Sequence, residues 1–152
     1  MYTNCDTITN KIDELNIAIS LNNPDIIVLT EVTPKNNRYI LQKSEIEIKG
    51  YSLYINNFNQ KGIRGLALYV KSHLTSSQIH IEEEADDTVW AEIKIEKNKN
   101  MLIGGIYRSP NNSHENNVKL WDTISKAVER NKENILLIGD FNCNGINWKD
   151  VM

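Results

Sequence analysis

Residues 135–142 read Ile135-Leu-Leu-Ile-Gly-Asp-Phe-Asn142, an apolar run followed by an acid and an amide with one residue between them. The apolar run predicts a strand that stops at Gly139. Since successive strand side chains point to opposite faces, we expect Asp140 and Asn142 on one side and Phe141 on the other. A carboxylate and a carboxamide side by side can orient a water molecule or a metal-bound phosphate. A strand that ends in an Asx turn explains the same residues as well.

The segment before this strand predicts a loop and a helix. The loop is Arg108-Ser-Pro-Asn-Asn-Ser113, and Ser113 suits the N-cap position of the helix. Helical spacing places four apolar residues on one face of that helix: Val118, Trp121, Ile124 and Val128.

The middle of the chain is dominated by β signals. Strands are predicted over Tyr51–Ile55, Leu66–Val70, Thr88–Ile95 and Met101–Tyr107. The third of these strands alternates apolar and polar residues, so we expect it to be half-exposed. The stretch Lys61–Gly65 predicts a turn before the second strand.

The first third of the chain predicts a helix followed by a strand. A short extended entry and a helix occupy Thr3 to about Asn23, with Ile8, Ile12, Leu15 and Ile19 at helical spacing. The continuous apolar run Asp25-Ile-Ile-Val-Leu-Thr-Glu31 is typical of a strand buried on both faces. In the polar stretch that follows, we expect a short helix around Tyr39-Ile-Leu-Gln42.

The order of these elements predicts the fold class. A helix and a strand, then consecutive strands, then another helix and strand indicate two sheets packed face to face with helices outside. With 152 residues and 17.5 kDa, the chain is one domain's worth and can bury a sizeable core.

Composition excludes several classes of protein. Charged residues at 24% and hydrophobic residues at 40% are ordinary for a globular domain, which argues against a disordered chain. No apolar run reaches the ~18 residues of a membrane span. The N-terminus has neither the basic nor the apolar region of a signal peptide, so we expect an intracellular protein, nuclear or cytoplasmic and not secreted. Cys5 and Cys143 lie far apart without metal-ligand spacing, which favours free thiols.

The charge balance constrains how the chain could bind a partner. A net charge of −3 and a pI of 5.6 argue against binding nucleic acid by bulk electrostatics. They do not exclude a nuclease whose divalent ion supplies the local positive charge. The three histidines have no catalytic partner near them in sequence, and the acidic run Glu82–Asp87 predicts a solvated turn.

Polar side chains at the ends of predicted strands are the candidates for chemistry. Glu31 ends a buried strand at its carboxyl end, so a metal ion is a sensible partner, although a charge also marks a strand's exit into solvent. Asn4 and Asp6 share one face of an extended segment, and Asp6 equally suits the first turn of the following helix. Tyr107 and Arg108 together suit phosphate oxygens, whereas an interfacial Tyr beside a surface Arg is the alternative.

The order of the motifs is more specific than any one of them. The segments are Asn4-x-Asp6, Pro24-Asp-Ile-Ile-Val-Leu-Thr-Glu31, Arg64-Gly-Leu-Ala-Leu-Tyr-Val-Lys71, Gly104-Gly-Ile-Tyr-Arg-Ser-Pro110 and Leu137-Ile-Gly-Asp-Phe-Asn142. Together they resemble the endonuclease/exonuclease/phosphatase superfamily across essentially the full chain. The apurinic-type endonuclease domain of non-LTR retrotransposons is the most similar type, since Tyr-Arg-x-Pro and Gly-Asp-Phe-Asn with a Trp soon after (here Trp148) are typical of it.

The resemblance implies an α/β protein with a four-layer α/β/β/α sandwich and hydrolysis of phosphoesters that depends on Mg²⁺ or Mn²⁺. Glu31 would be the principal metal ligand, with Asn4 and Asp6 beside it. The substrate implied is DNA, nicked for target-primed reverse transcription. A reverse-transcriptase domain would then be a partner in a longer polyprotein, and no membrane is involved.

The resemblance also implies roles for the remaining candidates. Tyr107 would contact the scissile phosphate, and Arg108 would contact the nucleic-acid strand. Asp140 would orient or deprotonate the attacking water. Asn142 would donate a hydrogen bond to a phosphate oxygen and help to fix Asp140, and Asn4 would also reach the substrate.

The sequence departs from the family pattern after Asn142. Family members carry a late Asp and a Ser-Asp-His motif whose His binds the scissile phosphate, and neither occurs before Met152. The resemblance therefore implies that residues 1–152 form one partial domain, incomplete at its C-terminus and impaired in activity. Two alternatives stay open: a superfamily phosphatase or exonuclease acting on another phosphoester, and a non-catalytic remnant of the fold.

Overall fold

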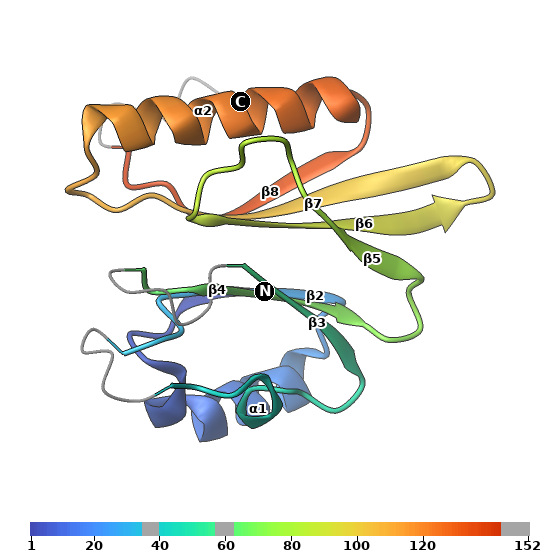
Figure 1. The fold of residues 1–152 in the computed structure, drawn as a ribbon. Coiled ribbons are helices and arrows are strands. Elements are labelled where there is room, and N and C mark those ends of the chain that lie inside the picture. The colour runs from blue at the N-terminus through green and yellow to red at the C-terminus, as the bar shows by residue number, and fades with distance from the viewer. Residues whose placement is uncertain (35–39, 57–62, 144–152) are drawn as a thin grey trace.

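The computed structural model describes residues 1–34, 40–56 and 63–143, which form two sheets packed face to face (Figure 1). One long helix covers the outer face of each sheet, so the layers run α1, first sheet, second sheet, α2. The expected four-layer α/β/β/α sandwich is confirmed.

The first sheet holds four strands in the order β1-β2-β4-β3. Their bounds are Tyr2–Asn4 for β1, Ile26–Thr30 for β2, Tyr51–Asn56 for β3 and Leu66–Lys71 for β4. β1 runs parallel to β2, whereas β4 is antiparallel to both of its neighbours. The helix α1, Ile12–Asn22, follows a short 3₁₀ turn at Ile8–Asn10 and packs on the outer face. The sequence placed the four strands correctly, whereas the helix begins at Ile12 and Ile8 lies in the 3₁₀ turn before it.

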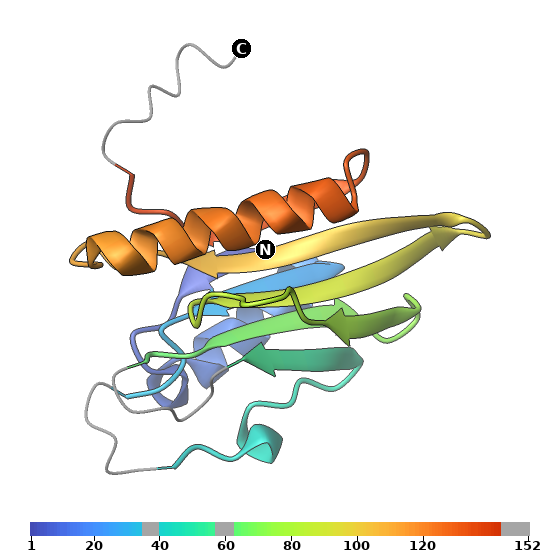
Figure 2. The same ribbon diagram turned by 45° about the horizontal axis from the view of Figure 1, so that its top comes forward.

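The second sheet holds four strands in the order β5-β6-β7-β8. Their bounds are Ser76–Ile79 for β5, Thr88–Glu96 for β6, Lys99–Tyr107 for β7 and Ile135–Asp140 for β8. β7 and β8 are parallel, and the helix α2, His114–Arg130, connects them. Figure 2 shows α2 lying along this sheet.

Apolar side chains fill all three spaces between the layers. Leu15 of α1 packs with Ile27 and Leu29 of β2, while Val28 of the same strand points into the space between the sheets. Because successive side chains of β2 enter different clusters, this strand is buried on both faces, as its continuous apolar run predicts. Trp90 of β6 belongs to the third cluster, beneath α2.

The prediction that Thr88–Ile95 is half-exposed is wrong for the first half of that strand. Thr88 and Trp90 point toward α2 and are fully buried, and the Trp90 ring N–H donates to the Thr88 hydroxyl at 3.1 Å. The alternation reappears only at Glu92 and Lys94, which have intermediate and full exposure. The physical reason is that α2 covers one end of β6.

The apolar face expected for α2 is not its core face. Val118, Trp121 and Val128 are exposed, and of the four residues only Ile124 packs partly against the core. The helix instead buries three other side chains: Leu120, Thr123 and Ala127. The Thr123 hydroxyl accepts a hydrogen bond from the Ala85 backbone N–H at 2.9 Å, which explains a polar residue on the buried face.

The short helix expected around Tyr39–Gln42 is not found at Ile40–Gln42, which are irregular. A 3₁₀ turn follows instead at Lys43–Glu45. Residue 39, residues 61–62 of the expected turn, and Trp148 lie outside the described residues. Cys5 and Cys143 are free thiols, as expected. None of the helices in the described ranges is long and apolar enough to cross a membrane.

Candidate active site

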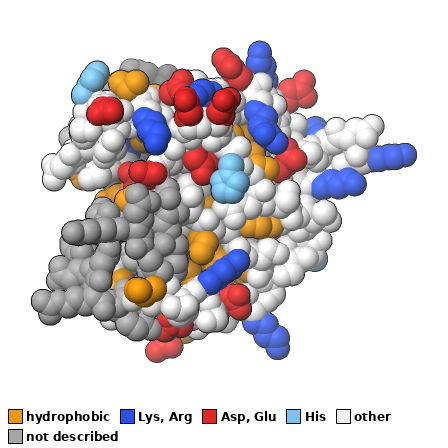
Figure 3. All heavy atoms as spheres, in the orientation of Figure 1, with side chains coloured by type: hydrophobic (Ala, Val, Ile, Leu, Met, Phe, Trp, Pro, Cys, Tyr) orange, Lys and Arg blue, Asp and Glu red, His pale blue; other side chains and the backbone are white. Residues whose placement is uncertain are grey.

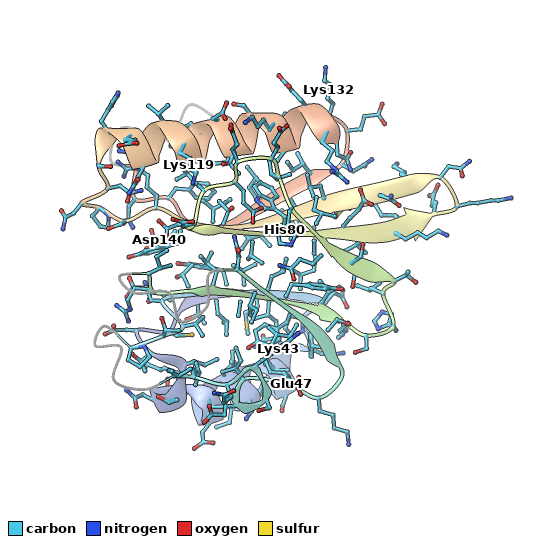
Figure 4. All side chains as sticks on the ribbon, in the orientation of Figure 1. Lys43, Glu47, His80, Lys119, Lys132 and Asp140 are labelled. Atoms are coloured by element: carbon cyan, nitrogen blue, oxygen red, sulfur yellow. The ribbon has the colours of Figure 1, made fainter. Side chains whose placement is uncertain are left out.

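The carboxyl ends of four strands meet at one edge of the sandwich. β1 and β2 end there in the first sheet, and β7 and β8 end there in the second, with Tyr107 and Asp140 opposite each other in register. Figure 4 shows Asp140 at this edge, at the level of the space between the sheets. Every candidate residue named from the sequence lies at the end of one of these strands or within two residues of it.

Glu31 accepts hydrogen bonds from residues of both sheets. It follows the last residue of β2 with a left-handed backbone (φ 54°), and its side chain is only 15% exposed. Its Oε1 accepts hydrogen bonds from Asn4 Nδ2 at 3.0 Å and from the Tyr107 hydroxyl at 2.9 Å. The alternative that Glu31 merely marks a strand's exit into solvent does not fit this burial and these contacts.

Arg64 holds the other oxygen of Glu31, although the sequence pattern placed it only in a predicted turn. Its guanidinium donates to Glu31 Oε2 at 2.6 Å and to Asp6 Oδ1 at 2.8 Å. The only available signal was its place in the Arg64–Lys71 motif. A contact across 58 positions of sequence leaves no local pattern.

Asn4 and Asp6 form a tight turn beside Glu31. The Asp6 backbone N–H donates to Asn4 Oδ1 at 3.0 Å, an Asx turn, and Asp6 has a positive φ of 41°. The carboxylate of Asp6 faces Arg64. The alternative role of Asp6 in capping the following helix is not what the structure shows, because Thr7 and Lys11 occupy the cap positions.

Tyr107 is held in its neutral form. Burial is the largest cause that raises the pKa of its phenol, and the hydrogen bond to Glu31 raises it further. A phenol with a raised pKa keeps its proton at neutral pH. In this arrangement Tyr107 donates that proton to Glu31 and thereby fixes the orientation of the carboxylate.

Arg108 and Asn142 bind each other. Arg108 donates from its guanidinium to the backbone oxygen of Asn142 at 2.7 Å, and Asn142 Nδ2 donates to the backbone oxygen of Arg108 at 2.8 Å. Arg108 Nε also donates to Asn117 Oδ1 of α2 at 2.9 Å. These contacts tie the segment after β8 to the loop before α2.

The strand periodicity used to place Asn142 does not apply. β8 ends at Asp140, and Asn142 has a positive φ of 43°. Phe141 does turn away, because it packs against the apolar cluster beneath α2. Asp140 and Asn142 still line the same shallow depression at this edge, together with Tyr2. Within the described part of the chain, the Asn142 backbone N–H does not donate to the Asp140 side chain, so the structure does not show the Asx-turn alternative at Asp140.

A pocket of about 250 Å³ adjoins the site, and its lining includes Arg64, Tyr107, Asp87 and Lys119. Figure 4 shows Lys119 on α2, on the side of Asp140. Burial, with a smaller contribution from Asp86, raises the pKa of Asp87 to about 6. The acidic run Glu82–Asp87 is therefore a solvated turn only in part, since Ala85 is buried and Asp87 is half-buried.

The donor set at Glu31 fits a hard divalent cation. Among the described residues, no three His, Cys, Asp or Glu side chains are grouped so that they could hold a metal ion by themselves. Magnesium, however, is commonly held by one or two carboxylates together with waters and substrate phosphates. Glu31 and Asp6 both converge on the Arg64 cation, which shows that the two carboxylates can hold one positive group between them.

The histidines take no part in this arrangement. His80 pairs with Glu84 at 3.1 Å, and its side chain is exposed. Figure 4 shows His80 away from Asp140. His73 and His114 are exposed as well.

The chain belongs to the Endonuclease/Exonuclease/phosphatase family, whose model matches residues 3–149. Members of this superfamily are phosphoester hydrolases. The resemblance found in the motifs is thus confirmed at the level of the family. Curated protein sequences gave no match.

Solved structures show the same fold. The endonuclease domain of TRAS1, a telomere-specific non-LTR retrotransposon, is 18% identical with a TM-score of 0.67, over 95% of this chain and 60% of that one. The 3′ phosphatase NExo from Neisseria, bound to product DNA hairpin, is 16% identical with a TM-score of 0.67, over 96% and 58%. The AP endonuclease LMAP from Leishmania major is 12% identical with a TM-score of 0.61, over 93% and 54%. This chain thus spans about three-fifths of the length of these proteins.

Proposed function

We propose that this site hydrolyses phosphodiesters with a divalent cation, and that its activity is the nicking of DNA. The observation that carries the proposal is the convergence of Glu31, Asp6, Asn4 and Tyr107 with Asp140 at the carboxyl ends of β1, β2, β7 and β8. Both sheets contribute polar side chains to the same edge. A carboxylate that was only a surface residue would not need partners from both sheets. The family and the TRAS1 domain among the neighbours support it.

Glu31, Asp6 and Asn4 would hold the cation, Mg²⁺ or Mn²⁺. Such an ion, when bound, relieves charge on the phosphoryl oxygens and lowers the pKa of a bound water. Tyr107 contributes by fixing Glu31, because its phenol keeps its proton and donates it to Oε1. Its proposed contact with the scissile phosphate needs the hydroxyl to exchange Glu31 for the substrate.

Asp140 would accept the proton of the attacking water. It lies opposite Tyr107 in register, and its backbone oxygen accepts a hydrogen bond from the Arg108 N–H at 2.7 Å. A positioned base contributes roughly 10²–10⁴-fold to a rate. The reciprocal bonds between Arg108 and Asn142 hold the segment that follows Asp140, so both residues would shape the substrate-binding edge.

Local charge rather than bulk charge would attract the DNA. On the face shown in Figure 3, acidic and basic side chains are interspersed over α2, and Lys126 pairs with both Asp122 and Glu83. The pocket beside the site places Lys119 and Arg64 near Tyr107, where a phosphate would lie. This arrangement agrees with a nuclease of net charge −3 that relies on its cation.

The biological setting we propose is that of a non-LTR retrotransposon. Residues 1–152 would form part of one endonuclease domain in a longer protein that also carries a reverse transcriptase. Nicking would then prime reverse transcription at the target. The support is the motif order together with the partial coverage of the TRAS1 domain, 60% of its length.

The direct test is nicking of supercoiled plasmid by the 152-residue protein in Mg²⁺ or Mn²⁺. We expect slow nicking that is lost in chelator and in Asp140→Asn. Circular dichroism of both proteins would establish that the variant is folded. Equal nicking by Asp140→Asn and the parent would exclude Asp140 as the base, and no nicking by the folded parent would contradict the endonuclease activity of these residues.

A phosphatase acting on DNA 3′ ends is the second candidate. The observation in its favour is that the NExo structure has the same TM-score, 0.67, as the TRAS1 domain. A 3′-phosphorylated oligonucleotide incubated beside the plasmid distinguishes the two activities. Release of phosphate without nicking would favour the phosphatase.

A further inference from the structure

We propose that Arg64 is an internal counter-cation of this site, which a divalent ion must displace from Glu31 and Asp6, so that Arg64 lowers the affinity of the site for that ion. The inference rests on the proposed metal site. In this view Arg64 positions the carboxylates of Glu31 and Asp6 and competes with the divalent ion for them. Among the described residues of the site, no other takes this role.

The guanidinium is fixed by three acceptors at once. Besides Glu31 and Asp6, its Nε donates to the Thr33 backbone oxygen at 2.9 Å. The backbones are joined as well, because Thr33 N–H donates to the Arg64 backbone oxygen at 2.8 Å. The Arg64 side chain is only 14% exposed. A planar guanidinium held in this way presents its fork to both carboxylates in a fixed geometry.

The contacts of Glu31 explain why a second cation would compete. Arg64 takes Oε2, while Asn4 and Tyr107 share Oε1. A divalent ion that binds Glu31 and Asp6 together must approach the oxygens that Arg64 already holds. Two cations on the same pair of carboxylates repel each other, most strongly beside Glu31, whose side chain is 15% exposed, and less beside Asp6, whose side chain is 68% exposed. Binding of the ion therefore requires the guanidinium to move away.

The adjoining pocket offers the displaced guanidinium another place. Arg64 already lines this pocket, and Asp86 and Asp87 line it as well. A movement into this pocket would thus carry the side chain from one pair of carboxylates toward another. Arg64 would then still line the pocket together with Tyr107 and Lys119, where a phosphate would be bound.

Calorimetric titration of the metal-free 152-residue protein with Mn²⁺ tests the proposal without an activity assay. We expect Arg64→Gln to bind Mn²⁺ about tenfold more tightly than the parent, or more, because a competing unit charge is removed. Arg64→Lys, which keeps the charge, should stay close to the parent. The matched control is Lys71→Gln at the other end of β4, since the Lys71 side chain is 15% exposed and pairs with Asp25 at 3.1 Å.

A second measurement uses the unaltered protein. The ¹⁵N NMR signal of the Arg64 Nε–H, assigned by its loss in Arg64→Lys, should shift or broaden as Mg²⁺ saturates the site. Mg²⁺ binding that leaves this signal unchanged would overturn the proposal even if Arg64→Gln failed to fold.

The outcomes separate this inference from the proposed function. Unchanged or weaker Mn²⁺ binding by folded Arg64→Gln, with binding still weakened in Glu31→Gln, would overturn the role of Arg64 alone. Absence of Mn²⁺ binding in the parent and in Arg64→Gln would overturn both. Tighter binding by Arg64→Gln and equally by Lys71→Gln would reduce the effect to net charge and also overturn the inference.

Discussion

The Tyr107 hydroxyl donates a hydrogen bond of 2.9 Å to Oε1 of Glu31 and so joins the second sheet to the first at the candidate active site. The strand β7 ends at Tyr107, and β2 ends one residue before Glu31. One side-chain contact therefore links the packing of the two sheets to the geometry of the site.

Replacing Tyr107 with Phe removes only this hydroxyl. We expect a loss of about 1–2 kcal/mol in the free energy of unfolding, because the acceptor is charged. Urea denaturation measures the loss. Tyr54→Phe is the matched control, since the Tyr54 hydroxyl also joins the two sheets but pairs with the neutral Ser76 hydroxyl at 2.8 Å. An equal or larger loss in Tyr54→Phe would show that the charge of Glu31 adds nothing to the Tyr107 contact.

Replacing Glu31 with Gln keeps the shape of the side chain and removes its charge. We expect Mn²⁺ affinity to fall by about tenfold or more, because a carboxylate ligand becomes a neutral amide. Calorimetric titration gives the affinity. Glu84→Gln is the control, because the Glu84 side chain is likewise 15% exposed but lies beside His80. If the two variants bound Mn²⁺ as the parent does, Glu31 would not be a metal ligand.

Gly139 is required where β8 passes β7. A Cβ atom there would run into the backbone of Ile106, and Gly139 has a φ of 154°. We expect Gly139→Ala to lower the free energy of unfolding by about 3 kcal/mol or more, since backbone cannot move aside as a side-chain end does. Gly50→Ala is the control: it has a positive φ of 88° but open space around it, so it should cost only about 1 kcal/mol. Equal losses of stability in Gly139→Ala and Gly50→Ala, measured by thermal unfolding, would show that the Ile106 backbone does not exclude a side chain at residue 139.

The raised pKa of Asp87 makes the free energy of unfolding depend on pH. Its pKa is about 6 in the folded protein against 3.8 for the free side chain, so folding disfavours the charged form. The resulting destabilisation is absent below pH 3.8, grows as the pH rises and is complete above about pH 6. We therefore expect Asp87→Asn to stabilise the protein by about 1–2 kcal/mol at neutral pH and hardly at all near pH 4.

Urea denaturation at both pH values measures the effect of Asp87→Asn. Glu96→Gln provides the control, because Asp87 directly precedes β6 and Glu96 is an exposed residue at the other end of that strand. A stabilisation that was equally large at both pH values would mean that burial of the charge is not its cause.

The buried face of α2 can be tested with two neighbouring residues. Leu120 is 1% exposed and Trp121 is 42% exposed. We expect Leu120→Ala to cost about 2–5 kcal/mol by leaving a cavity, and Trp121→Ala to cost less than about 1 kcal/mol. Chemical denaturation measures the loss of each variant in the free energy of unfolding. A larger loss in Trp121→Ala than in Leu120→Ala would mean that the face expected from the sequence is the buried one.

Local patterns accounted for most of the fold. The apolar run before Glu31 identified a strand buried on both faces, and the run before Asp140 identified the strand that ends at the site. These predictions succeeded because side-chain periodicity reports directly on backbone geometry. They failed where another layer changed the environment, at Trp90 under α2 and on the helix face that carries Trp121.

Sequence alone determined the family, the order of the elements apart from the missed strand β5, and the strand ends that carry Asn4, Glu31, Tyr107 and Asp140. Only the tertiary structure decided what those side chains contact. Glu31 meets Tyr107 across 76 positions of sequence, and Arg64 meets Asp6 across 58. Periodicity describes neighbours along one element, whereas the partner of a charged side chain depends on how separate elements pack. For that reason Arg64, which holds both carboxylates, became visible only when the two sheets and their loops were in place.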